Sequence, residues 1–197
     1  MKISVFGDSI TWGASDYEKG GWVERLKVEM MKNTDDVSVY NVGVSGANTD
    51  DLLRRFDIEA KARQPNVIIF AIGINDSQYI KTKDNPRVDL EKFRSNILEL
   101  IEKARKFTGK IIFVGLTKVD ESRVMLVPWD QEKYYSNESV SRYDSELRKI
   151  CEEGKLKFVR LFDLLENSDL EDGLHPNASG HQKIYEKVKE ELGGLIK

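Results

Sequence analysis

Short apolar runs and longer amphipathic stretches alternate along the chain. Five runs hardly alternate in polarity and are mostly rich in valine, isoleucine and phenylalanine; they occupy residues 3–6, 37–42, 67–72, 111–116 and 158–162. Continuous apolar runs of this length are typical of strands covered on both faces, as in a parallel sheet. The pattern therefore predicts five buried strands.

Between these runs, apolar residues recur at helical spacing. The clearest stripe has the i, i+3, i+4 spacing of an amphipathic helix and consists of Leu90, Phe93, Ile97, Leu100, Ile101 and Ala104. Four further helices are expected near Trp22, near Leu52, at residues 140–153 and after Pro176. Strand and helix thus alternate along the whole chain.

This alternation predicts an α/β fold with a parallel sheet and helices on both faces. No repeat and no linker interrupts the 197 residues, so we expect a single domain over residues 1–197. In such sheets ligands bind beyond the carboxyl ends of the strands. Residues that directly follow the apolar runs are therefore the candidates for function.

Composition narrows the class of protein. Acidic residues number 34 and basic residues 31, and no long Lys/Arg block stands out, which argues against a nucleic-acid partner. No apolar run approaches the roughly 20 residues that cross a bilayer, and residues 3–6 are too short for the apolar core of a signal peptide. The lone Cys151 excludes an internal disulfide framework and a multi-cysteine zinc site. We expect a cytoplasmic protein without membrane insertion.

Four short clusters of glycine and polar residues follow the apolar runs. They read Gly-Asp-Ser at 7–9, Asn-Val-Gly-Val-Ser-Gly at 41–46, Gly-Ile-Asn-Asp at 73–76 and Asp-Gly-Leu-His-Pro at 172–176. Each alone is compatible with an ordinary turn. A glycine-containing turn after the first strand is also compatible with phosphate binding at a helix N-terminus.

Together the clusters contain the parts of a serine-nucleophile site. A hydroxyl nucleophile needs a neighbouring base, which a third group must orient. His181 falls inside a predicted helix and is expected to be structural, whereas His175 precedes a proline and is expected in a loop. Asp172 is placed to hold Nδ1 of His175 and leave Nε2 for Ser9. We predict Ser9 as nucleophile, His175 as base and Asp172 as the orienting acid.

Acyl transfer also needs hydrogen-bond donors where the oxyanion develops. The candidates are the backbone N–H groups of Ser9 and Gly46 and the side-chain amide of Asn75. Glycine lets the backbone approach a ligand closely, and asparagine donates without adding a charge. Asp8 and Asp76 are expected to order their turns rather than to act on the substrate.

In this order, the four clusters resemble the signature blocks of the GDSL, or SGNH, hydrolases, and the resemblance spans nearly the whole chain. It implies a flavodoxin-like three-layer α/β/α sandwich whose five-stranded parallel sheet has the order 2-1-3-4-5. It also implies a serine esterase, lipase, thioesterase or carbohydrate deacetylase that acts on a small-molecule ester without a metal or organic cofactor. The name-giving residues would be Ser9, Gly46, Asn75 and His175, with Asp172 as the triad acid.

Residues 117–139 are long for a connection in an α/β fold, where about 2–6 residues are usual. This segment contains three candidates for the substrate pocket, Met125, Trp129 and Tyr134, and a fourth candidate, Trp12, lies three residues after Ser9. The segment is compatible with a wall or lid over the pocket, with packing onto the sheet edge, or with a homodimer contact. The sequence leaves these three interpretations open.

Two other functions stay open at this point. One is a phosphate- or flavin-binding module of the flavodoxin-like fold, with phosphate held by residues 9–11; against it, Asp8 would repel the anion. The other is a catalytically silent carbohydrate-binding relative. Neither the acyl length nor the leaving group can be read from the sequence.

Overall fold

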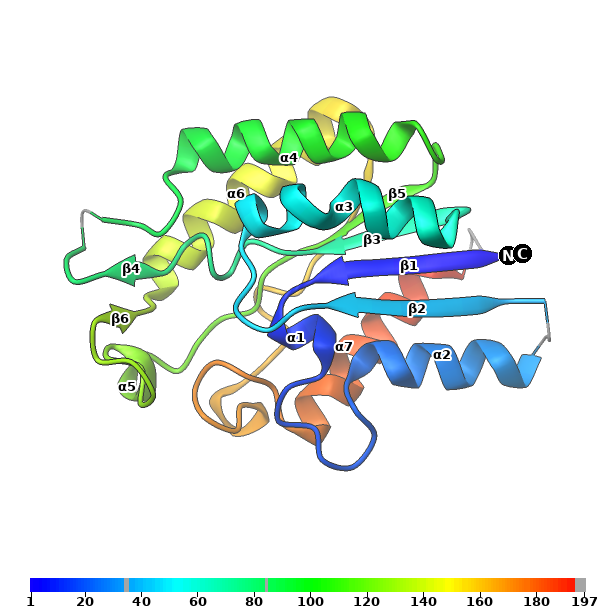
Figure 1. The fold of residues 1–197 in the computed structure, drawn as a ribbon. Coiled ribbons are helices and arrows are strands. Elements are labelled where there is room, and N and C mark those ends of the chain that lie inside the picture. The colour runs from blue at the N-terminus through cyan, green and yellow to red at the C-terminus, as the bar shows by residue number, and fades with distance from the viewer. Residues whose placement is uncertain (34–35, 84, 194–197) are drawn as a thin grey trace.

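The computed structural model describes residues 1–33, 36–83 and 85–193. Its centre is a parallel sheet in the order β2-β1-β3-β5-β7, which is 2-1-3-4-5 when the strands of this sheet are counted along the chain (Figure 1). The strands are β1 (Lys2–Gly7), β2 (Ser38–Gly43), β3 (Val67–Ala71), β5 (Ile111–Val114) and β7 (Lys157–Val159). The predicted fold class and strand order are confirmed.

Helices cover both faces of this sheet. On one face α2 packs against α7, and on the other α3 packs against α4 and α4 against α6 (Figure 1). The long helices are α2 (Trp22–Asn33), α3 (Thr49–Arg63), α4 (Leu90–Arg105), α6 (Asn137–Gly154) and α7 (Ala178–Leu192). The short ones are α1 (Ser9–Trp12), α5 (Glu121–Val124) and a 3-10 turn, η1 (Asn167–Asp169). The result is three layers.

Strand β1 shows why the apolar runs are continuous. Ile3 and Val5 lie in the core under α2 and α7, whereas Phe6 points to the opposite core. There its ring packs against Phe56 of α3, with ring centroids 4.9 Å apart. Because both faces are covered, β1 is buried from Ile3 to Gly7 and has no solvent side on which polar residues would alternate.

The fifth apolar run is longer than the strand it predicts. Only the part up to Val159 pairs in the sheet, whereas Leu161, three per cent exposed, is buried in the core beside α7. Apolar residues beyond the strand are therefore buried by tertiary packing.

Helix α6 begins earlier than predicted, at Asn137, because Ser136 caps it by accepting a hydrogen bond from the N–H of Ser139.

The segment 117–139 contains α5 and a short strand, β6 (Lys133–Tyr134). β6 pairs antiparallel with β4 (Tyr79–Ile80), a small second sheet that the sequence did not predict because two-residue strands carry no periodic signal. The segment's apolar residues divide into two groups. Val124, Val127 and Tyr135 are buried, whereas Met125, Leu126 and Trp129 are exposed. Core packing therefore accounts for only part of its apolar content.

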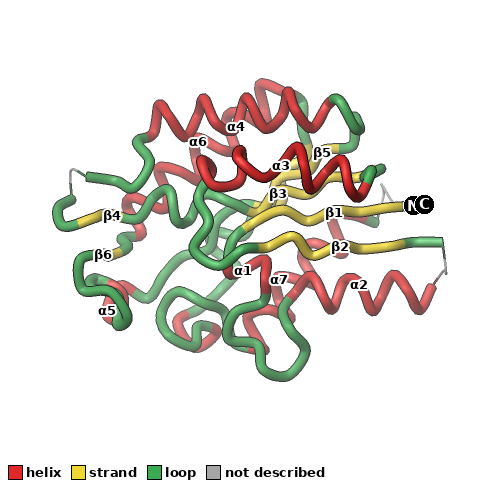
Figure 2. Tube along the Cα trace, in the orientation of Figure 1, coloured by secondary structure: helices red, strands yellow, loops and turns green. Residues whose placement is uncertain are grey.

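The loops that follow the parallel strands leave the sheet at one edge (Figure 2). This edge carries all four clusters found in the sequence. Within the described ranges, no helix combines the length and the apolar character that a bilayer span requires.

Candidate active site

The first cluster forms a tight turn between β1 and α1. Ser9 is the first residue of α1, and Asp8 caps this helix by accepting a hydrogen bond from the N–H of Ile10 at 2.9 Å. A Cβ on Gly7 would lie 2.0 Å from the hydroxyl oxygen of Thr11 and 2.3 Å from the carbonyl oxygen of Ala71. Only glycine fits there, so the turn is fixed by close packing and Asp8 orders it.

Ser9 lies at one end of a hydrogen-bonded chain of three side chains. Its Oγ is 2.9 Å from Nε2 of His175, and Nδ1 of His175 is 2.6 Å from Oδ2 of Asp172. The other carboxylate oxygen of Asp172 accepts the backbone N–H groups of Leu174 and His175, at 2.9 and 2.8 Å. The structure thus brings the predicted nucleophile, base and acid together at hydrogen-bond distances.

The charge state of Asp172 suits an orienting role. Burial alone would raise the pKa of its carboxyl, but the hydrogen bonds from the side chain and backbone of His175 outweigh burial and lower the pKa. Asp172 is therefore an anion at neutral pH and accepts the Nδ1 proton of His175. This leaves Nε2 as the acceptor toward Ser9.

The two loops that carry the other predicted donors are joined to each other. Nδ2 of Asn75 donates to the carbonyl oxygen of Ala47 at 2.9 Å, next to Gly46. Gly46 has a φ of 74°, in the left-handed region that glycine adopts without strain. Asn75 is 4% exposed, and its Oδ1 accepts a hydrogen bond from the hydroxyl of Tyr135 at 2.8 Å. Tyr135 was not singled out by the sequence.

Asp76 ties the same two loops a second time. Its two oxygens each lie 3.1 Å from the backbone N of Thr49, the first residue of α3, and Oδ1 also accepts the Thr49 hydroxyl. That hydroxyl in turn accepts a hydrogen bond from Nδ2 of Asn96 at 2.8 Å. Asp76 is thus a structural tether for the Asn75 loop, as the sequence led us to expect.

Arg55 of α3 forms hydrogen bonds with the ends of β1 and β2. Its guanidinium donates to the carbonyl oxygens of Gly7 and Val42, both at 3.0 Å, and to Glu59 at 2.7 Å. These two carbonyls belong to the first two clusters, at the ends of their strands. No local pattern indicates this contact, because Arg55 and Gly7 are 48 residues apart along the chain.

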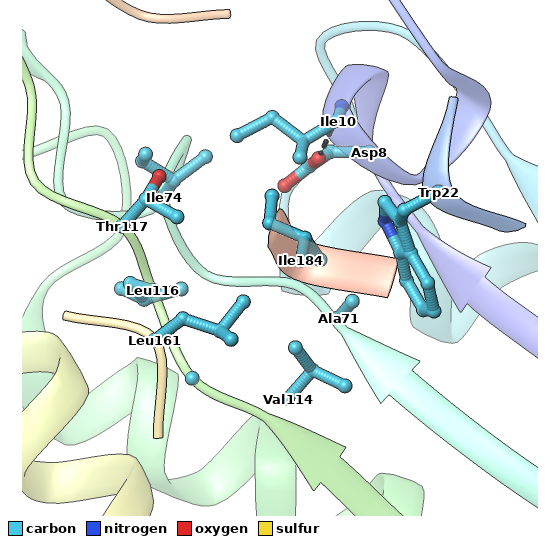
Figure 3. A pocket seen from close by; sticks show the side chains of 11 residues that line it. Asp8, Ile10, Trp22, Ala71, Ile74, Val114, Leu116, Thr117, Leu161 and Ile184 are labelled. Atoms are coloured by element: carbon cyan, nitrogen blue, oxygen red, sulfur yellow. Dashed lines mark hydrogen bonds between the residues drawn. The ribbon is translucent and has the colours of Figure 1, made fainter. Parts of the chain in front are cut away.

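Asp8 lines a small, partly open cavity near the strand ends. This cavity of about 30 Å³ is lined mainly by apolar side chains, among them Ile74, Leu161 and Ile184. Figure 3 shows the Asp8 carboxyl directed toward this space. Burial raises the pKa of Asp8 to about 6, against the hydrogen bond from Ile10, which lowers it. Burial likewise raises the pKa of Asp76 to about 7, against the bonds from Thr49.

We expect an Asp8→Asn variant to gain thermal stability relative to the parent as the pH rises. The unfolded chain releases the Asp8 proton near the ordinary pKa of 3.8, whereas the folded protein holds it up to about 6. The folded state therefore binds the extra proton in this window, and the parent loses stability there as the pH rises. Asparagine keeps the cap on Ile10 but has no proton to lose.

The measurement is the Tm of parent and variant by calorimetry at pH values between about 4 and 7. The difference in Tm should grow as the pH rises to about 6, and Asp76, whose pKa the Asp8 charge helps to raise, extends this growth toward pH 7. His181, whose pKa is lowered by burial, gives the parent an opposite trend, but it contributes equally to both proteins. A difference in Tm that does not change with pH would contradict the assignment.

His181 has the structural role expected of it. It is fully buried; its Nδ1 accepts the backbone N–H of Trp22 at 3.3 Å, and its Nε2 donates to the carbonyl oxygen of Ala14 at 3.0 Å. Both ring nitrogens are therefore used to fasten α7 to the loop before α2. This leaves His175 as the histidine beside Ser9.

The candidate pocket residues differ in where they lie. The ring of Trp129 lies over His175, with centroids 5.5 Å apart and an interplanar angle of 32°, and is 54% exposed. Trp12 and Met125 are exposed, at 58% and 41%. Tyr134 is 8% exposed and packs on the ring of Tyr79, at 5.2 Å between centroids. Of the four, Trp129 has a ring contact with a residue of the Ser9–His175–Asp172 chain.

Comparison with known proteins identifies the family to which a chain with this fold and this arrangement of side chains belongs. The model of the GDSL-like lipase/acylhydrolase family matches residues 5–183, and the chain belongs to this family. It is thereby a member of a family of carboxylic ester hydrolases.

The individual relatives share a quarter to about a third of the aligned residues with this chain. The chain is 35% identical over 124 residues to the uncharacterized lipoprotein YqeF of Bacillus subtilis, an alignment that covers 60% of this chain and 49% of that protein. It is 25% identical over 205 residues to a GDSL esterase/lipase of Arabidopsis thaliana, with coverage of 98% and 64%. The chain thus spans about half to two thirds of the length of these curated relatives.

Solved structures agree in fold. A lipase/acylhydrolase from Enterococcus faecalis superposes with a TM-score of 0.80 at 21% identity, over 100% of this chain and 97% of that one.

The cytoplasmic location expected from the sequence has no support from these comparisons, because one relative is named a lipoprotein.

Proposed function

We propose that this chain hydrolyses small-molecule carboxylic esters through an acyl-enzyme on Ser9. The observation that carries the proposal is the chain of hydrogen bonds from Ser9 to His175 to Asp172, at 2.9 and 2.6 Å, in a member of an acylhydrolase family. A serine hydroxyl is a weak nucleophile, and it is activated when a base held in the correct tautomer takes its proton.

In the proposed cycle, Oγ of Ser9 attacks the carbonyl carbon while Nε2 of His175 takes the hydroxyl proton. The tetrahedral intermediate collapses when His175 returns that proton to the leaving oxygen, which breaks the ester bond and releases the alcohol. Water then attacks the acyl-enzyme with His175 as base, and the carboxylic acid leaves with Ser9 restored. Asp172 holds Nδ1 throughout and stabilises the imidazolium. Every proton in this cycle moves between Ser9, His175, the substrate and water.

The developing oxyanion would be held by the backbone N–H groups of Ser9 and Gly46 and by Nδ2 of Asn75. Support for this assignment comes from the hydrogen bond between Asn75 and Ala47, which keeps the second and third donors in adjoining loops. Such donors act strongly because they are fixed before the charge develops.

The leaving group is a separate question, and the rim of the site gives one indication. Trp129 covers one side of His175 and still exposes half of its surface, so an apolar or ring-shaped group of the substrate would contact it. A panel of p-nitrophenyl esters from C2 to C16, an acyl-CoA and acetylated sugars would separate alcohol, thiol and sugar leaving groups.

A fluorophosphonate probe tests the nucleophile directly. We expect the probe to add its mass at Ser9, located by peptide mass spectrometry, and to stop hydrolysis of p-nitrophenyl acetate in step with labelling. A Ser9→Ala variant is the blank and should take no label. Labelling at another serine, or full activity after complete labelling of Ser9, would refute the proposal.

A further inference from the structure

Tyr135 is a buried residue whose hydroxyl contacts the candidate site. Its side chain is 1% exposed, and its hydroxyl donates to Oδ1 of Asn75 at 2.8 Å, across 60 residues of sequence. Burial raises the pKa of Tyr135 well above its ordinary value, so the hydroxyl keeps its proton and remains a donor.

The position of this hydroxyl is fixed by the segment on either side of it. The backbone N–H of Tyr135 donates to the carbonyl oxygen of Val124 at 2.9 Å, and the preceding residue, Tyr134, pairs with Tyr79 in the small sheet. The following residue, Ser136, caps α6. Backbone and cap contacts therefore hold Tyr135 in place independently of Asn75.

The amide of Asn75 is held from two sides. An asparagine side chain has one acceptor oxygen and two N–H donors. The oxygen is bound by Tyr135, and one N–H is bound by the carbonyl of Ala47 at 2.9 Å, which leaves the second N–H for a ligand. Donation to the oxygen of an amide also polarises its N–H bonds, because hydrogen bonds in a chain strengthen one another.

We propose that Tyr135 is a positioning residue for ester hydrolysis, acting through Asn75 by fixing and polarising the amide that faces the oxyanion. The proposal rests on the function proposed above and gives the segment 117–139 a second task besides packing. Without the hydroxyl, Oδ1 of Asn75 becomes a buried acceptor without this partner, and the amide is free to rotate away from Ala47.

The test is a double-mutant cycle of Tyr135→Phe and Asn75→Ala, with kcat and KM for p-nitrophenyl acetate as readouts. Removing the oxyanion donor in Asn75→Ala should lower kcat by about 10²–10³-fold. Tyr135→Phe should lower kcat by about tenfold and change KM by less than about twofold, because the Asn75 amide that Tyr135 positions bonds the oxyanion in the transition state. In the Asn75→Ala background, Tyr135→Phe should have no further effect.

Tyr143→Phe is the matched control. Tyr143 is equally buried, at 2% exposure, and its hydroxyl donates to the carbonyl oxygen of Val88, which is not part of the site. The same loss of a buried hydroxyl should leave kcat within about twofold of the parent, although it costs stability. A loss of kcat equal to that of Tyr135→Phe would mean that any buried hydroxyl matters, and the proposal would fail.

The outcomes separate this proposal from the proposed function. If the parent hydrolyses esters and Asn75→Ala is impaired, but Tyr135→Phe is fully active or equally harmful in both backgrounds, only the role of Tyr135 is refuted. If the parent has no esterase activity, the proposed function itself fails. Should Tyr135→Phe not fold, the parent is examined by NMR: a slowly exchanging Tyr135 hydroxyl proton with a nuclear Overhauser effect to the Asn75 amide supports the contact, and its absence refutes it.

Discussion

Replacing Ser9 by alanine should lower kcat for p-nitrophenyl acetate by at least about 10⁴-fold, the range found when a serine hydrolase loses its nucleophile. The physical reason is that no acyl-enzyme can form, while the oxyanion donors and the binding surface remain. Some activity above that of water is therefore expected to persist. The measurement is steady-state hydrolysis, with burst kinetics to show that the acyl-enzyme is lost.

The chain offers a matched control for this variant in β1, the strand that precedes Ser9. Ser4 of β1 is fully buried, and its hydroxyl has no hydrogen-bond partner among the residues that the structure describes. Ser4→Ala makes the same chemical change five residues away and should leave kcat unchanged. If Ser9→Ala retained activity close to that of Ser4→Ala, Ser9 would not be the nucleophile.

Asp172→Asn should be the second most damaging change, with a loss of about 10³–10⁴-fold in kcat. Oδ1 of an asparagine would still accept the backbone N–H groups of Leu174 and His175, so the loop should keep its shape. The amide would, however, present N–H to Nδ1 of His175, which places the ring proton on Nε2 and removes the acceptor for the Ser9 hydroxyl.

The control for Asp172→Asn is a carboxylate outside the site. Asp163 is exposed and pairs with Lys118, so Asp163→Asn should change kcat by less than about twofold. Melting temperatures of both variants show whether folding is affected. Activity of Asp172→Asn within about tenfold of the parent would mean that another group orients His175.

The parts of the fold that sequence predicted are those with strong local signals. The strands β1, β3 and β5 were visible because residues on both of their faces are buried, and α4 was visible because its apolar stripe is regular. The clusters around Ser9, Asn75 and His175 could be placed together for a related reason. All follow parallel strands, and parallel strands end at the same edge.

The parts that sequence missed depend on contacts between distant residues. Tyr135 reaches Asn75 across 60 residues, and Arg55 reaches Gly7 across 48. In the local sequence, Tyr135 has the pattern of an ordinary core tyrosine, and Arg55 has that of an ordinary arginine on a helix surface. The small β4–β6 sheet was missed because each strand has two residues, too few to show a period.

The double attachment between the loop at 46–49 and the loop at 73–76 limits how this site can diverge. Asn75 is bonded to Ala47, and Asp76 to Thr49, so an insertion in either loop would separate both pairs at once. These two loops should therefore be inherited as a unit, with compensating changes arising in pairs. The exposed side chains around Trp129 take no part in this double attachment. New substrate preferences should therefore arise there first.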